Sequence, residues 1–458
     1  MARLLFITIG LSGGLNSNLE FARRAAQQGH AVSFLGHRDL RERIGYHGFD
    51  YVRVVHDEQA RSELQERVDN VGVVRALPMA LRLRRELVAS PEIELAVADI
   101  APDALIIDVE AHYALIATHP LRIPTITKSD FFSFAHQRGI PPLHSTQDMP
   151  RNLADRVKAE FEWGKAKGKR MVTKTLGELH PRRIARRWTP FRYNTVMRRD
   201  LKAVAKARGL DLNDISSQQG WLWPQTYPDL PLVSTTPQEL DFVSKTSPND
   251  QWVGPLIPSA RPAAETAAGT NQDWETFKDR NEHSGRPLLY CSFGTMWPNI
   301  AAMVEIVIQA VMQRDDWDLV VGLGGRGGQQ LTTEHGRNIL VLDYAPQLEV
   351  LANADLAIIH GGINGILESL AFGVPVIVER GGAGDAPGNA SRVKHFGVGR
   401  SIGIADQTAA SLASLIDQVL NDSAMQARVT TLQSQFLAYQ ENQVLERFLE
   451  RFLQSSSE

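Results

Sequence analysis

Residues 342–393 read "LDYAPQLEVLANADLAIIHGGINGILESLAFGVPVIVERGGAGDAPGNASRV", and their pattern indicates the fold class. The apolar segment "LAIIH" at 356–360 has the length of a strand, and two glycines separate it from a segment with helical spacing that starts near Asn364. A second apolar segment, "VPVIVE", follows at 374–379. Strands that alternate with a helix predict a parallel sheet covered by helices on both faces.

The same alternation runs through both halves of the chain, in "LLFITIG", "AVSFLG", "YVRVV", "ALIID" and "IPTIT" and again in "LLYCSFG", "DLVVGLG" and "NILVLDY". We therefore expect an α/β protein with two doubly wound, Rossmann-like domains that face each other across a cleft. The expected parts are a first domain at 1–245 with a basic helical insertion at 151–225, a Pro- and Ala-rich linker at 246–285, and a second domain at 286–435. A final helix at 436–458 is expected to pack back on the first domain.

Composition fits a soluble, cytoplasmic protein. The chain has 458 residues, of which 43% are apolar and 22% charged, with a net charge of -3. No apolar run reaches the roughly 18 residues of a membrane span. The single cysteine, Cys291, excludes an internal disulfide and fits a reducing compartment. No His and Cys spacing indicates a metal site, and we expect neither a metal nor a cofactor. The sequence does not specify the oligomeric state.

Positive charge is concentrated between residues 151 and 208, where 18 Lys and Arg stand against 5 Asp and Glu, a net of +13. This segment is either a solvated helical face or a surface for anionic lipid or an anionic substrate, which would place the protein at the periphery of a membrane. No nucleic-acid-binding module accompanies the charge, so nucleic acid is not an expected partner.

The amino terminus also combines a strand, at residues 4–9, with a glycine-rich turn and a helix. Ser17 and Glu20 have the spacing of a capping box, which predicts that the helix begins at Ser17. Gly13 and Gly14 precede it and line the carboxyl end of the strand, where open α/β sheets bind ligands. A dinucleotide site is an alternative at "VVGLGGRGG", but the segment after these glycines is polar and unpatterned rather than helical.

The decisive stretch also carries candidate binding groups. Glycines after strand 356–360, among them Gly362, let backbone N–H groups approach a phosphate at a helix amino terminus. His360 ends the strand and can donate to a diphosphate oxygen. Asn364 and Glu368 are four residues apart and share a helix face, where a carboxylate can accept from sugar hydroxyls.

"YAPQ", "HGGINGILE", "GVP" and "DAPGNA" stand in the same order and at matching spacing as the motifs of the UDP-glycosyltransferase superfamily, which the chain resembles over nearly its whole length. "YCSFGT" at 290–295 is similar to the superfamily's serine-rich loop. The resemblance implies the GT-B fold of bacterial macrolide, carotenoid and natural-product glycosyltransferases. It assigns the nucleotide base to Tyr344, Ala345 and Gln347, and the ribose to Glu368. It assigns the diphosphate to Thr295, His360, Asn364 and Gly365, and the donor sugar to Asp385.

Two departures from the superfamily pattern concern the donor. The superfamily's tryptophan is Tyr344 here, which offers a smaller stacking surface to the base. Its Asp-Gln pair is Asp385 followed by Ala386, so a side chain that contacts sugar hydroxyls is missing. The base, in UDP or dTDP, and the sugar therefore stay open.

A third departure concerns catalysis. The superfamily's first loop carries a histidine that takes the proton of the acceptor hydroxyl, and its place is Gly14, with Gly13 and Asn16 kept. In one alternative Asp108, which matches the aspartate that orients this histidine, serves as base with His112. In a second, the acceptor is acidic enough to ionise unaided. In a third, the protein is a catalytically inactive auxiliary or partner-binding protein.

The acceptor side is expected to include Gly13, Gly14 and Asn16. Phe131 and Phe132, which follow a strand, either line an apolar acceptor pocket or belong to the core. The resemblance implies an inverting, metal-independent glycosyltransferase of the hexosyltransferase type. It would move a sugar from a nucleotide sugar to a small apolar or aromatic acceptor.

Overall fold

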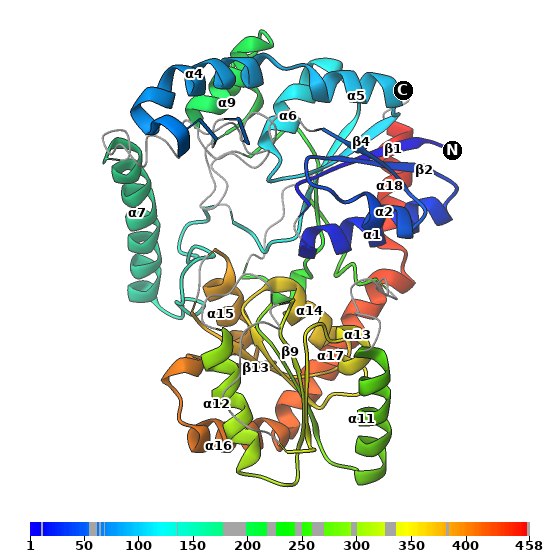
Figure 1. The fold of residues 1–458 in the computed structure, drawn as a ribbon, viewed down its shortest axis with the longest axis vertical. Coiled ribbons are helices and arrows are strands. Elements are labelled where there is room, and N and C mark those ends of the chain that lie inside the picture. Colours follow the sequence, from blue (N-terminus) through cyan, green and yellow to red (C-terminus); the bar gives the residue numbers. More distant parts are fainter. Residues whose placement is uncertain are drawn as a thin grey trace.

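The structure is a computed structural model (Figure 1). The residues that it describes are 1–10, 12–54, 62–63, 66–67, 69–134, 136–176, 198–217, 226–242, 250–258, 270–294, 300–325, 336–381 and 384–455.

The first half forms a seven-stranded parallel sheet in the order β3-β2-β1-β4-β5-β6-β7. Its strands are β1 (Arg3–Thr8), β2 (Ala31–Gly36), β3 (Asp50–Arg53), β4 (Ala104–Asp108), β5 (Thr125–Ser129), β6 (Leu232–Ser234) and β7 (Asp250–Trp252). Successive side chains of a strand point to opposite faces, so Leu4 and Phe6 pack on one face of β1 while Leu5 and Ile7 pack on the other. The sheet extends past residue 245, because β7 lies where the sequence predicts a linker.

Helices cover both faces of this sheet. Apolar side chains on one face pack against α1 (Ser12–Gln27), α2 (Arg41–Tyr46) and α18 (Val444–Ser455). The other face packs against α4 (Val73–Ala89), α5 (Glu92–Ile100), α6 (His112–Thr118), α9 (Arg198–Ala207) and α10 (Leu212–Ile215). We call this sheet and its helices the first lobe.

The second half forms a six-stranded parallel sheet in the order β10-β9-β8-β11-β12-β13. Its strands are β8 (Leu288–Ser292), β9 (Asp318–Gly322), β10 (Ile339–Leu342), β11 (Leu356–His360), β12 (Val376–Glu379) and β13 (Gly399–Ile402). The helices of this second lobe are α11 (Thr270–Ser284), α12 (Ile300–Met312), α13 (Gln347–Leu351), α14 (Ile363–Ala371), α15 (Ala386–Phe396), α16 (Ala409–Leu420) and α17 (Ser423–Glu441). Two doubly wound sheets are what the alternating pattern predicts, and the fold class is confirmed.

The lobes lie one above the other in Figure 1, and the end of the chain connects them a second time. Helix α17 belongs to the second lobe, whereas α18 returns to the first, where Leu445 and Leu449 are buried against the sheet. A buried ion pair also joins the lobes, because Arg392 Nη2 of α15 lies 2.6 Å from Asp241 Oδ1. Phe132 and Phe242 stack on the Arg392 guanidinium, 4.8 and 4.3 Å from their ring centroids.

Helix α7 (Leu153–Leu176) stands apart at the side of the molecule (Figure 1). It begins the basic segment, of which residues 177–197 lie outside the described part. No helix in the described ranges combines the length and the apolar character needed to cross a bilayer.

Candidate functional site

Each sheet has one point at which the order of its strands reverses. In the first sheet β1 and β4 meet there, and in the second sheet β8 and β11. Ligands of open α/β sheets bind in the crevice outside the carboxyl ends of the strands at such points. The two crevices face each other, because a Cβ placed on Gly13 would lie only 2.0 Å from Asn364 Nδ2 of α14. Gly13 therefore makes room for a side chain of the other lobe.

Helix α1 begins at Ser12, five residues before the start that the capping-box pattern predicts. Ser17 does not cap a helix, since its hydroxyl donates to the Gly14 carbonyl at 2.9 Å and to Asp130 Oδ1 at 2.5 Å. Glu20 instead pairs with Arg23 and Arg24. Gly13 and Gly14 thus form the first turn of the helix, at the crevice.

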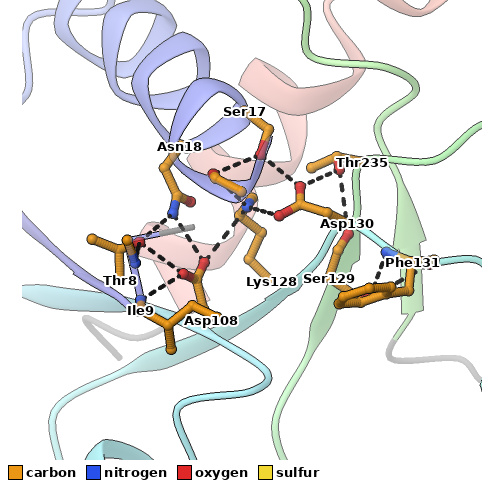
Figure 2. A network of polar contacts seen from close by, with 12 residues as sticks. Thr8, Ile9, Ser17, Asn18, Asp108, Lys128, Ser129, Asp130, Phe131 and Thr235 are labelled. Carbon is orange, nitrogen blue, oxygen red and sulfur yellow. Dashed lines mark hydrogen bonds and ion pairs between the residues drawn. The ribbon is translucent and has the colours of Figure 1, made fainter. Parts of the chain in front are cut away.

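Asp108, Lys128 and Asp130 form a charged cluster at the ends of β4 and β5, which we call the first-lobe cluster (Figure 2). The Lys128 ammonium, fully buried, lies 2.7 Å from Asp130 Oδ2 and 3.5 Å from Asp108 Oδ1. Burial alone would lower the pKa of Lys128, but the two carboxylates outweigh it and raise the pKa above its ordinary value. The lysine is therefore charged and holds both carboxylates in place.

Both carboxylates of the cluster are also occupied by neutral donors. Asp108 accepts from the Thr8 hydroxyl at 2.9 Å, the Ile9 amide at 3.1 Å and Asn18 Nδ2 at 2.9 Å. Asp130 Oδ1 accepts from Ser17 and, at 2.7 Å, from Thr235 (Figure 2). A Cβ on Gly14 would lie 3.1 Å from Asp130 Oδ2, so this carboxylate borders the space that a histidine at position 14 would use.

His112 lies at the start of α6 and its ring contacts Tyr227. Its ring is fully buried at the start of α6, and Nδ1 is 3.2 Å from the Tyr227 hydroxyl. Burial lowers the pKa of His112 to about 3, which makes the imidazole a weak base. The geometry therefore gives no support to the expected pairing of His112 with Asp108.

On the second lobe, His360 is wedged between two glycines. A Cβ on Gly294 would lie 2.7 Å from His360 Cε1, and a Cβ on Gly362 would lie 2.3 Å from Nε2. Burial lowers the pKa of His360 to about 4, although a hydrogen bond to the Ser292 backbone acts in the opposite direction. The imidazole is thus neutral near pH 7 and lies directly before α14, whose amino terminus starts after Gly362.

The residues expected around the base and ribose come together between α13 and α14. Gln347 Nε2 donates to Glu368 Oε2 at 2.5 Å, and Gln347 Oε1 accepts from the Tyr290 hydroxyl at 3.1 Å. Tyr344 is 41% exposed and its hydroxyl lies against Gly325, where a Cβ would be 2.0 Å away. Ala345 packs against Gly322 in the same way, at 3.1 Å.

Asp385 is the N-cap residue of α15, and its carboxylate accepts from Asn389 Nδ2 at 2.7 Å. The same amide donates to the Gly361 carbonyl at 2.9 Å, which ties α15 to the loop after β11. Burial raises the pKa of Asp385. Ala386 packs so closely on Gly361 that a Cβ there would lie 2.6 Å from the Ala386 carbonyl oxygen.

The expected acceptor residues differ in their surroundings. Phe131 is partly buried, whereas Phe132 is fully buried beneath Arg392 and has no surface to offer an acceptor. Phe132 is therefore a core residue of the lobe interface. Asn16 accepts a hydrogen bond from Arg43 of α2. Gly365 lies within α14, and Thr295 falls outside the described residues.

Lys128 and Asp130 were not singled out as site residues from the sequence. A signal was present in "TITKSD", where a lysine falls inside a strand whose other residues suit burial, with an aspartate two positions later. Glu110, a buried carboxyl in the turn after β4, was not singled out from the sequence either. Among the described residues, no group of three or more His, Cys, Asp or Glu is placed to hold a metal ion.

Comparisons with known proteins agree with this fold. The family described as erythromycin biosynthesis protein CIII-like, C-terminal domain, matches residues 306–448. Demethyllactenocin mycarosyltransferase of Streptomyces fradiae is 24% identical over 92% of this chain and 80% of its own length. Zeaxanthin glucosyltransferase of Pantoea ananas is 24% identical over 90% of this chain and 87% of its own length. The crystal structure of the glycosyltransferase of kitacinnamycin superposes with a TM-score of 0.68 at 20% identity, covering 99% of each chain.

Two facing doubly wound lobes give the chain the GT-B fold, and its similarity to glycosyltransferases indicates an enzyme of the transferase type. The chain is similar to the UDP-glycosyltransferase superfamily, and the two relatives named above are glycosyltransferases.

Proposed function

We propose that the protein transfers a sugar, with inversion, from a nucleotide diphosphate sugar bound to the second lobe to a small acceptor bound to the first. The observation that carries the proposal is the contact of the two crevices at Gly13 and Asn364, which brings a glycine-lined helix amino terminus opposite a charged cluster. A donor in the second crevice and an acceptor in the first would meet where the lobes meet.

The second-lobe residues suit the parts of a nucleotide sugar. Gln347 would hold the base, and Tyr344 would stack on the base. Glu368 would accept hydrogen bonds from the ribose hydroxyls instead of its present hydrogen bond from Gln347. The amino terminus of α14 carries partial positive charge, which favours a diphosphate beside His360 and Asn364. The same charge stabilises the nucleoside diphosphate as it leaves. Asp385 would face the sugar. No step in this scheme requires a metal ion.

The donor proposal is tested by isothermal titration calorimetry with UDP, dTDP, GDP, NAD and FAD. We expect UDP or dTDP to bind and the dinucleotides not to bind. A hydrogen bond to a charged group contributes about 1.5 to 3 kcal/mol, so His360→Ala and Glu368→Ala should each weaken the nucleotide by roughly tenfold or more. His119→Ala, an exposed histidine of the first lobe, is the control and should bind normally. Unchanged affinity in His360→Ala would contradict the donor site.

A second proposal concerns α7, for which we propose a contact with an anionic membrane surface. Leu153, Val157 and Phe161 are spaced four residues apart and are 77%, 61% and 62% exposed, so they form an apolar stripe on one face of the helix. Helices that combine an apolar face with basic residues bind at lipid interfaces. The net charge of +13 between residues 151 and 208 has the sign that such a contact needs.

A further inference from the structure

The group that replaces the missing histidine must lie at the first crevice and be able to take a proton. Asp108 and Asp130 lie there, but their oxygens are already occupied. Asp108 accepts hydrogen bonds from three neutral donors and is paired with the Lys128 ammonium. Asp130 accepts from Ser17, Thr235 and the same ammonium. These donors occupy the oxygens of both carboxylates and hold them in place. Neither is suited to remove the proton of a hydroxyl.

Glu110 lies two residues after Asp108, in the turn between β4 and α6. Backbone hydrogen bonds fix this turn, from the Val109 amide to the Lys128 carbonyl and from the Ala111 amide to the Asp108 carbonyl, both at 2.8 Å. The turn follows β4 at the point where the strand order reverses, which places Glu110 at the carboxyl edge of the first sheet, where ligands of open α/β sheets bind. Sequence pattern does not single it out, because it stands among ordinary turn residues.

Glu110 is 8% exposed, and within the described part of the chain its carboxyl has no hydrogen-bond partner. The charged groups that act on it come from three elements: Asp108 from β4, Lys128 and Asp130 from β5 and the loop after it, and Asp385 from the start of α15. Asp385 belongs to the second lobe. Glu110 is therefore a buried carboxyl of the acceptor lobe within electrostatic reach of the carboxyl that would face the donor sugar.

We propose that Glu110 is the catalytic base of this enzyme, taking the acceptor proton in place of the absent histidine. This inference rests on the proposed function. The acceptor hydroxyl oxygen forms the new bond to the anomeric carbon while the bond from that carbon to the diphosphate oxygen breaks. The nucleoside diphosphate leaves with the bonding electrons, and the hydroxyl proton passes to a Glu110 carboxylate oxygen and then to water.

The surroundings of Glu110 suit this role. Burial, and next the charges of Asp108 and Asp130, raise the pKa of Glu110 well above its ordinary value, while Lys128 opposes them. A carboxylate with a raised pKa is a stronger base, and sites that work by proton transfer push the pKa values of neighbouring carboxyls apart. Asp108 and Asp130 of the first-lobe cluster thus supply negative charge that helps to raise the pKa of Glu110.

The test is a comparison of the wild type, Glu110→Gln and Glu110→Asp, with the exposed Glu86→Gln as the matched control. Glutamine keeps the shape of the side chain but cannot take the proton. With an aliphatic alcohol as acceptor, Glu110→Gln should lower kcat by about 100-fold or more, the contribution of general-base catalysis. With a phenol that is already ionised at the assay pH, the loss should be far smaller, because no base is needed. Nucleotide affinity should stay within about twofold of the wild type.

Two further readouts separate a base from a structural residue. The kcat/KM of the wild type should fall at acidic pH as Glu110 is protonated, at a pKa above 4.5, and this limb should be absent in Glu110→Gln and present in Glu86→Gln. A raised pKa in the folded state also costs stability above pH 4.5, because ionisation then favours the unfolded chain. Glu110→Gln should therefore melt at a higher temperature than the wild type at pH 8, and this difference should shrink towards pH 5.

Glu110→Asp should keep the acidic limb at a reduced rate, and it decides the question if the glutamine variant does not fold. Wild-type kcat in Glu110→Gln with the alcohol, or an unchanged acidic limb, would overturn the role of Glu110 while leaving the glycosyltransferase proposal intact. Absence of transfer by the wild type itself, with every nucleotide sugar, would overturn the proposed function instead. In that case a melting temperature of Glu110→Gln at or below that of the wild type at pH 8 would also contradict the raised pKa assigned to Glu110.

Discussion

At the scale of single residues, His360 shows how neighbours set the state of a binding group. Gly294 and Gly362 leave the imidazole just enough space, and burial keeps it neutral with a pKa of about 4. A diphosphate placed beside it would add negative charge, which stabilises the imidazolium and raises this pKa. The neutral ring of the free protein should thus take up a proton when a nucleotide binds.

We predict that UDP or dTDP binding is linked to proton uptake at His360. The pKa of His360 is about 4 in the free protein and rises in the complex. Nucleotide affinity should therefore be highest below pH 4 and should fall as the pH rises from there to the pKa of the complex. Calorimetry at pH 6 in two buffers of different ionisation enthalpy measures the protons taken up. His360→Asn, which keeps a donor but does not titrate, should take up fewer protons. Equal uptake by both proteins would contradict the prediction.

At the scale of the elements, a feature could be predicted from the sequence where the residues that determine it are close together in the chain. The strands, the glycine turn after His360 and the helix that follows it could be predicted, because apolar runs and glycine spacing are local signals. The start of α1 could not, since Ser17 bonds to Asp130, 113 residues later. Glu110 is equally hidden, because the charges that act on it lie on β5 and on the other lobe.

Helix α7 gives a prediction at this scale. The wild type should sediment with vesicles that contain anionic lipid more than with neutral vesicles, and added salt should weaken this binding because the attraction is screened within about 8 Å at physiological ionic strength. Val157→Ser and Phe161→Ser should reduce sedimentation. Leu437→Ser, at an exposed leucine of α17, should not. Binding that responds to neither lipid charge nor these substitutions would show that α7 is only a solvated helix.

At the scale of the whole molecule, the contacts between the lobes set the geometry of the site. Asp241 and Arg392 are 151 residues apart in the chain and form a buried pair next to Phe132, so the loops of the first lobe are fixed against α15. Two alternating halves predict two lobes, yet no local pattern indicates which side chains meet between them. For this reason the sequence left open whether Phe132 lines an acceptor pocket or belongs to the core. The contact with Arg392 of the other lobe shows that it belongs to the core.

Sugar transfer by the wild type with EDTA present tests both the inversion and the independence from metal ions. The protein would be incubated with UDP- and dTDP-linked α-sugars and a panel of alcohols and phenols, and NMR would give the anomeric configuration of the product. We predict a β-linked product formed at a rate that EDTA does not change. An α-linked product, loss of activity with EDTA, or no transfer from any of these donors would contradict the central claim of inverting, metal-independent transfer between the two lobes.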